Sequence, residues 1–340
     1  MKRALMAIVC LFGVLSVFAF PAGAAPRPLL AYVSGFESPD GMDIRIRYSD
    51  GSERRVDPEG VNTPAAGDYH VASWFSISPD GQKIAFVAWN VACLTSNCLS
   101  TEGMIYTINV DGTGLMPIYS PPEEFWVASP EWSPDGNRIM FVAYYNRDED
   151  GRKRHTNLWV LDESVPGTWT ASPLVTRIGG EKWPEWSPDG KHVVYEYQPD
   201  DDGYAKKGDL DGTTIGLSRS DGSDTHRDLT SDARFVTDAV FSPDGKWIAY
   251  ADYHAPWASD GALIRVMRRD GSGKRTIASG LKYPWGLDYS PDGRFIALGE
   301  GWKWVHTRIL RVEVAKPHRS KVLIDNLDEP DHLPEYFPVP

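Results

Sequence analysis

Cysteine is scarce in this chain of 340 residues, which contains three. Cys10 lies in an apolar run without the small residues that a lipoprotein site needs before its cysteine, so we expect no lipid anchor. Cys93 and Cys98 stand close together, and in an oxidising compartment such a pair most simply forms a small disulfide. A metal site is the alternative, but two thiols without a nearby histidine or third cysteine make a poor zinc site.

Positive charge is also in short supply. The chain has 35 Lys and Arg against 47 Asp and Glu, a formal net charge of −12. Binding to nucleic acid phosphates needs a basic surface. We therefore expect no nucleic-acid partner.

Long apolar runs are limited to residues 4–20, and these 17 residues are short for a membrane-spanning helix. Lys2 and Arg3 precede the run, and Ala22-Gly23-Ala24 follows it, as in a cleavable signal peptide. We predict a signal peptide over residues 1–24. The mature chain, residues 25–340, would then be periplasmic or secreted, without stable membrane insertion. A membrane anchor is the alternative interpretation.

One tetrapeptide is abundant. Ser-Pro-Asp-Gly occurs five times in the same frame, after an aromatic or apolar residue and before an apolar run. Its aspartates, spaced 55, 54, 55 and 48 residues apart, are Asp80, Asp135, Asp189, Asp244 and Asp292. A repeat of this length with several short strands indicates a propeller or a similar array. A further copy at residues 38–41 follows its apolar run and is not counted. We expect the aspartates to accept hydrogen bonds within their turns.

The repeats define six units of short strands. The first unit, near the N-terminus, lacks its first strand, and residues 334–338 resemble the first strands at residues 130–134 and 184–188. The sequence therefore predicts an all-β fold: a six-bladed β-propeller of four-stranded antiparallel blades, the first closed by the C-terminal strand. A disordered tail is the alternative. Asp-Gly pairs, which favour positive φ, are expected to join the third and fourth strands in four units.

The aromatic-Ser-Pro-Asp-Gly frame, with an apolar strand and an Asp-Gly-Ser hairpin after it, resembles the TolB-type propeller repeat over nearly the whole mature chain. TolB proteins are periplasmic, carry an α/β domain before the propeller and work with the peptidoglycan-associated lipoprotein. About five residues separate the predicted signal peptide from the first strand here, so we expect that domain to be absent. The repeat also precedes the catalytic domain of prolyl-oligopeptidase-like enzymes, but this chain has no G-x-S-x-G motif.

Antiparallel strands would place two kinds of connection on opposite faces. The short Pro-Asp-Gly and Asp-Gly turns lie on one face, and the long segments at residues 90–103, 146–157, 198–212, 252–262 and 300–307 lie on the other. Long variable loops are where binding usually resides. We expect the ligand or partner site on the loop-rich face, at the mouth of the central channel.

Aromatic and histidine residues are expected at this mouth, in the links before the first strands and in the neighbouring loops. Aromatic rings give a large contact area for sugars, peptides or proteins. The alternative is that they plug the channel or pack between blades. The candidate residues are Tyr69, His70, Trp126, Trp183, Phe235, Trp257, Tyr283, Trp285, Trp302 and His332.

Catalytic and metal-binding residues cannot be assigned by motif. His70 and His332, joined by His254 or His306, could suit a transition metal, but isolated surface histidines are the simpler interpretation. Residues 146–151 begin like a calcium loop, yet Asn157 stands where the bidentate glutamate belongs. We expect no cofactor; calcium or a transition metal is the alternative.

The leading functional hypothesis is an exported, monomeric scaffold that binds an envelope or extracellular protein, a peptide or a glycan. The alternative is a metal-assisted polysaccharide lyase, similar to oligogalacturonate lyases, or a lactonase at the channel mouth. A stand-alone role in the Tol envelope system is a third hypothesis.

Overall fold

The computed structural model describes residues 6–11, 14–19, 28–34, 43–48, 52–56, 68–93, 98–100, 103–145, 155–177, 179–199, 212–223, 225–230, 235–253, 261–302, 305–317, 320–327 and 332–336. These residues form strands joined by turns, and none of them is helical. Within these ranges there is accordingly no apolar helix long enough to cross a membrane.

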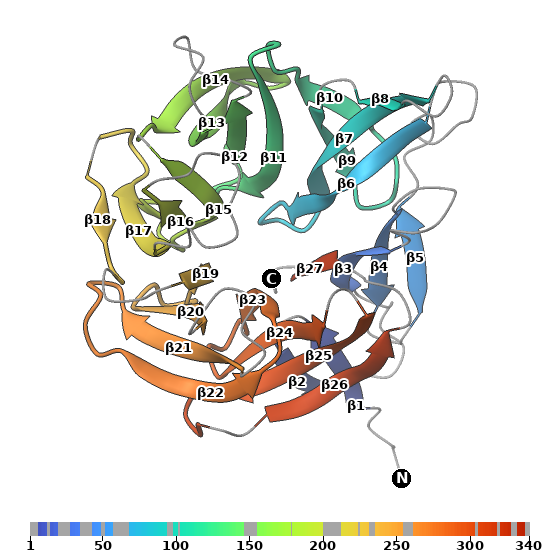
Figure 1. Cartoon of the computed structure of the whole chain (residues 1–340). Helices are drawn as coiled ribbons and strands as arrows, with labels where there is room; N and C mark the ends of the chain where they lie inside the picture. Colours follow the sequence, from blue (N-terminus) through green and yellow to red (C-terminus); the bar gives the residue numbers. More distant parts are fainter. Residues whose placement is uncertain are drawn as a thin grey trace.

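The strands form antiparallel sheets arranged around a ring (Figure 1). The first strands, which face the centre, are β6 (Asp68–Ile77), β11 (Phe125–Trp132), β15 (Gly180–Trp186), β19 (Phe235–Phe241), β23 (Pro284–Tyr289) and β27 (His332–Tyr336). The second strands are β3 (Pro28–Ser34), β7 (Lys83–Cys93), β12 (Arg138–Tyr145), β16 (His192–Gln198), β20 (Trp247–Tyr253) and β24 (Phe295–Trp302).

The outer half of each unit contains its third and fourth strands. The third strands are β4 (Asp43–Tyr48), β9 (Met104–Asn109), β13 (Thr156–Val165), β17 (Thr214–Arg219), β21 (Ala262–Arg268) and β25 (Val305–Glu313). The fourth strands are β5 (Glu53–Val56), β10 (Met116–Tyr119), β14 (Thr168–Val175), β18 (Arg227–Asp228), β22 (Arg275–Leu281) and β26 (Ser320–Leu327). We number the units by sequence, so unit one contains β3, β4 and β5.

Unit one combines both ends of the chain. β27 pairs antiparallel with β3, with Tyr336 opposite Leu30 and Glu335 opposite Ala31. β3 then pairs with β4, and β4 with β5. The first strands of successive units also contact one another around the ring, and β27 contacts both β23 and β6. Strands far apart in sequence therefore share one sheet.

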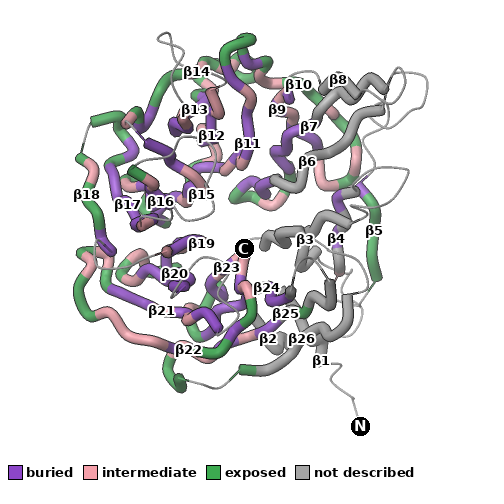
Figure 2. Tube along the Cα trace, in the orientation of Figure 1, coloured by how far each residue is buried: buried purple, intermediate pink, exposed green. Residues whose placement is uncertain are grey.

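Apolar clusters fill the spaces between consecutive units. One contains Ile46 of unit one and Phe86 of unit two, and the next contains Val87 of unit two and Phe141 of unit three. Further clusters lie between units three and four, four and five, and five and six. Figure 2 shows the buried residues along the middle of the units, with exposed residues on outer strands such as β18. The sheets of units two to five thus bury both faces against their neighbours.

The Ser-Pro-Asp-Gly turns follow one hydrogen-bonding pattern. In unit four, Ser187 donates through Oγ to Asp189 Oδ1 at 2.6 Å, and the Lys191 N–H donates to the same oxygen at 3.1 Å. Ser187 Oγ in turn accepts the His192 N–H at 2.9 Å. Gly190 has a φ of 66°, which favours glycine. The same contacts recur at the other four copies, which confirms that these aspartates accept hydrogen bonds within their turns.

The first strands are longer than the sequence indicated, and this is a correction. Residues expected in the links before them, including Trp126, Trp183 and Phe235, lie inside β11, β15 and β19. A β-bulge lets each first strand continue: two residues of β11 stand opposite one residue of β12 between the pairs Ala128–Val142 and Glu131–Met140. Equivalent register shifts occur in β15, β19, β23 and β27.

Three further short strands lie outside this pattern. β1 (Met6–Leu11) and β2 (Val14–Ala19) form an antiparallel hairpin within the predicted signal peptide, which itself stays a prediction. β8 (Cys98–Ser100) pairs with the end of β7, and this register places Cys93 opposite Cys98. The backbone pairing agrees with the proposed disulfide, which also stays a prediction because the side chains lie outside the described part.

Candidate functional site

The two ends of the first strands carry aromatic residues in different environments. We call the end of the ring with the Ser-Pro-Asp-Gly turns the turn face and the opposite end the loop face. At the turn face, the residue before each serine is buried: Trp132, Trp186, Phe241 and Tyr289 are at most 6% exposed. Toward the loop face, the aromatic side chains of Trp126, Trp183, Phe235 and Trp285 remain partly exposed.

Trp126 has the most regular stacking contact of this group. Its ring lies 3.8 Å from that of Tyr144, with an interplanar angle of 8°. The two residues are cross-strand partners in β11 and β12, and Tyr144 packs against the cluster between units three and four. The pair presents a preformed, partly exposed aromatic surface near the loop face.

Phe235 and Tyr283 share one apolar environment between units five and six. Both pack against the apolar cluster between these units. The Phe235 ring lies 5.4 Å from that of Tyr253, whose hydroxyl donates to the Pro284 carbonyl at 2.5 Å. Packing therefore accounts for part of the surface of these two candidates, while both stay partly exposed.

Trp183 lies in the bulge of β15, and Trp285 lies next to the bulge of β23. Trp183 has a φ of 49°, in the left-handed region that non-glycine residues rarely adopt. Ser129, Asp238 and Gly286 occupy the same place, four residues before the turn serine, and also have positive φ. Trp285 lies over Gly299 so closely that a Cβ there would meet its ring at 2.6 Å. Sequence reasoning missed this bulge, because its position holds a different residue type in each of these four units.

For several residues predicted from the sequence, the exposure of the side chain is not described. The side chains of Tyr69, His70, Trp302 and His332 lie outside the described part, although their backbones lie in β6, β24 and β27. Trp257 falls outside the described residues altogether. Their place in the site stays a prediction.

Carboxylates form a second set on the first strands, and sequence reasoning did not single them out. Glu131, Glu185 and Asp288 each lie two residues before the turn serine, next to a buried aromatic residue. Since neighbouring residues of a strand point to opposite faces, these carboxylates lie on the face opposite that aromatic residue. In unit five the carboxylate is Asp238, in the bulge. The repeated Pro-Glu-aromatic sequence was a signal that could have found Glu131 and Glu185.

The environment of two of these carboxylates, Glu185 and Asp238, disfavours negative charge. Burial raises the pKa of Glu185 to about 8. Burial also raises the pKa of Asp238 to about 6, against the lowering effect of the Gly286 N–H, which donates to it at 3.4 Å. Burial therefore favours the neutral form of both groups. A cationic group brought next to either would favour its ionised form, so the inner strands suit a ligand with positive charge.

Metal chemistry finds no support among the described residues. No group of three or more His, Cys, Asp or Glu in the described ranges is placed to hold a metal ion. The predicted calcium loop and His254 lie outside these ranges, as do the side chains of His70, His306 and His332. The histidine and calcium hypotheses thus stay untested.

Comparison with known proteins defines the class of fold. TolB from Acinetobacter baumannii matches with a TM-score of 0.63 at 18% identity, over 90% of this chain and 66% of that one. A putative TolB from Agrobacterium tumefaciens gives 0.55 at 17%, over 93% and 100%. Oligogalacturonate lyase from Vibrio parahaemolyticus gives 0.59 at 13%, over 88% and 75%. The protein has a TolB-like β-propeller fold, and identities this low show the fold alone.

Sequence comparison adds one relative. An uncharacterized protein of Agrobacterium fabrum is 27% identical over 200 residues, which is 54% of this chain and 62% of that protein. The match therefore spans less than two thirds of the relative. No family model matches the chain.

Proposed function

We propose that this protein is an exported, monomeric six-bladed propeller, closed by β27, that binds a protein or peptide at its loop face. The observation that carries the proposal is the contrast along the first strands, where aromatic residues are buried at the turn face and partly exposed toward the loop face. Partly exposed aromatic side chains that are already held by packing give contact area at a small cost in entropy.

The carboxylates narrow the class of partner. Glu131, Glu185, Asp238 and Asp288 lie on the same strands as the partly exposed aromatic residues. A segment with both aromatic or aliphatic and basic side chains would cover the rings and bring cations to the acids. The proposed partner is therefore a basic, partly apolar peptide segment of an envelope or extracellular protein. A neutral glycan could stack on the aromatic rings but would bring no cation to the carboxylates.

Selection from a random peptide library on the purified protein tests this proposal, with a glycan array and soluble peptidoglycan-associated lipoprotein as parallel probes. We expect basic, aromatic-rich peptides to be selected. The double variant Trp126→Ala/Trp183→Ala should lose their binding while its circular dichroism stays unchanged. Trp247→Ala, which removes a partly exposed tryptophan from the turn face, is the matched control. Equal binding by wild type and the double variant would refute the proposal.

A further inference from the structure

A pocket of about 660 Å³ lies on the turn face between units four and five. We call it the arginine pocket. Unit four contributes His192 and Arg227 to its lining, and unit five contributes Lys246, Trp247, Arg268 and Arg269. Its volume is within the usual range for sites that take small molecules.

The charge of this pocket is opposite to that of the chain. Four of its lining side chains are cationic and one, Asp270, is anionic, in a protein with a net charge of −12. Like charges held close together repel each other. Either neighbouring groups within the protein neutralise these cations, or a ligand does.

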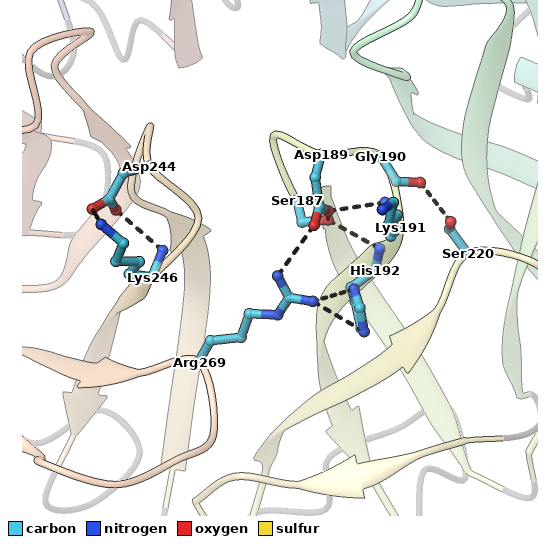
Figure 3. A network of polar contacts seen from close by, with 9 residues as sticks. All are labelled: Ser187, Asp189, Gly190, Lys191, His192, Ser220, Asp244, Lys246 and Arg269. Carbon is cyan, nitrogen blue, oxygen red and sulfur yellow. Dashed lines mark hydrogen bonds and ion pairs between the residues drawn. The ribbon is translucent and has the colours of Figure 1, made fainter.

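Two of the cations have carboxylate partners in the turns. Arg269 Nη1 lies 3.3 Å from Asp189 Oδ2, and Lys246 Nζ lies 3.2 Å from Asp244 Oδ2 (Figure 3). The Arg269 Nη2 group also donates to His192, 2.5 Å from its Nδ1. Burial, together with the Arg269 charge, lowers the pKa of His192 and so favours the neutral ring that accepts this bond. The Arg269 contacts join unit five to unit four, and the Lys246 ion pair lies within unit five.

The other two cations, Arg227 and Arg268, contact uncharged groups instead of forming a close ion pair. Both side chains are exposed. Arg227 Nη2 donates to the main-chain carbonyl of Asp270 at 3.1 Å, and the Arg268 guanidinium carbon lies 5.7 Å from the centroid of the Trp247 ring. The Asp270 carboxylate accepts the Ser272 N–H at 2.9 Å within its own turn. A carbonyl and a ring carry no formal charge. Besides the hydrogen bonds from Ser272, the charges of Arg268 and Arg227 lower the pKa of Asp270, so this carboxylate offsets part of their positive charge. Two guanidinium groups against one carboxylate leave this part of the pocket with a net positive charge.

We propose that the arginine pocket binds a small organic phosphate. Guanidinium groups present planar pairs of donors that match phosphate oxygens, and Arg227 and Arg268 would supply them from two different units. A bare phosphate ion would fill a small part of the pocket, so the remaining space, with Trp247 on one side, accommodates an organic ring. This site is independent of the loop face and of the function proposed for it.

Calorimetric titration of the full-length protein at low ionic strength tests the proposal, with glucose 6-phosphate, inorganic phosphate and glucose as probes. We expect glucose 6-phosphate to bind most tightly, inorganic phosphate more weakly, and glucose not measurably. The variant Arg227→Gln/Arg268→Gln should weaken glucose 6-phosphate binding at least about tenfold, because each charged hydrogen bond contributes to affinity.

Arg294→Gln is the matched control, because Arg294 is an exposed arginine beside the unit six turn and its side chain is 68% exposed. This variant should bind as the wild type does. Equal affinity for glucose and glucose 6-phosphate would overturn the proposal. A loss in the control as large as in the double variant would also overturn it, since the effect would then reflect overall charge.

Discussion

The two ends of the first strands place their aromatic residues in different environments. At the turn face, the aromatic residue before each serine packs between units, and the turn beside it satisfies its own polar groups. Toward the loop face, the same strands bulge, and their aromatic residues stay partly exposed beside carboxylates. The turn end of the first strands therefore stabilises the fold, and the loop end carries the partly exposed rings at which we propose that a partner binds.

The largest expected difference between the two ends is in stability. Trp186 is 3% exposed, and its Nε1 donates to the Glu131 carbonyl at 3.2 Å. Trp186→Ala should lower the free energy of unfolding by about 3–5 kcal/mol, because it leaves a cavity between units. Trp126→Ala should cost about 1–2 kcal/mol, since it removes a partly exposed stacked ring. Urea unfolding of both variants measures the difference, and equal losses would contradict the distinction between the ends.

A second expected difference concerns pH. Burial raises the pKa of Glu185 from 4.5 to about 8 in the folded protein, so folding is disfavoured as this group ionises. The contribution of this group to stability should therefore fall as pH rises from about 4.5 to 8. Glu185→Gln should match the wild type at pH 4 and exceed it at pH 9, by on the order of 2 kcal/mol. Thermal unfolding at both pH values measures this. A variant that is less stable at pH 9 would show that the carboxylate is stabilised instead.

The smallest effect is expected at a turn-face carboxylate. The Ser187 hydroxyl, with further help from the Lys191 N–H and Arg269, lowers the pKa of Asp189 to about 2. Its contribution to stability should be present above about pH 4 and disappear as pH falls through 2. Because the Asp189 side chain is 44% exposed, solvent screens the charge, and Asp189→Asn should cost less than about 1 kcal/mol at pH 7. A matching loss at pH 2 would mean that the shape of the turn, not the charge, is responsible.

Local features were predicted from sequence, and long-range ones were not. Ser-Pro-Asp-Gly sets a turn through contacts within six residues, so its repetition predicted the turns and the strands that follow. The bulge at Trp183 depends on pairing with β16 and has no consistent residue type, so it was missed. The arginine pocket combines residues from His192 to Arg269, which share no motif and meet because units four and five pack together.

The loop-face site itself stays a proposal, and the structure shows the exposure of some of its candidate residues. The aromatic candidates Trp126, Trp183, Phe235, Tyr283 and Trp285 are partly exposed as a binding surface requires, but they lie in or beside the first strands. The spacing of tryptophans could not distinguish a link from a bulged strand. The raised pKa of Glu185 and Asp238 comes from burial, which depends on the packing of neighbouring units.

Hydroxyl-radical footprinting of tryptophan residues, with and without a selected basic peptide, tests the division between the two faces most directly. Trp126 and Trp183 should become protected from oxidation when the peptide binds, and Trp247 should react at an unchanged rate. Protection of Trp247 without protection of Trp126 and Trp183 would place the partner on the turn face and contradict the assignment of binding to the loop face.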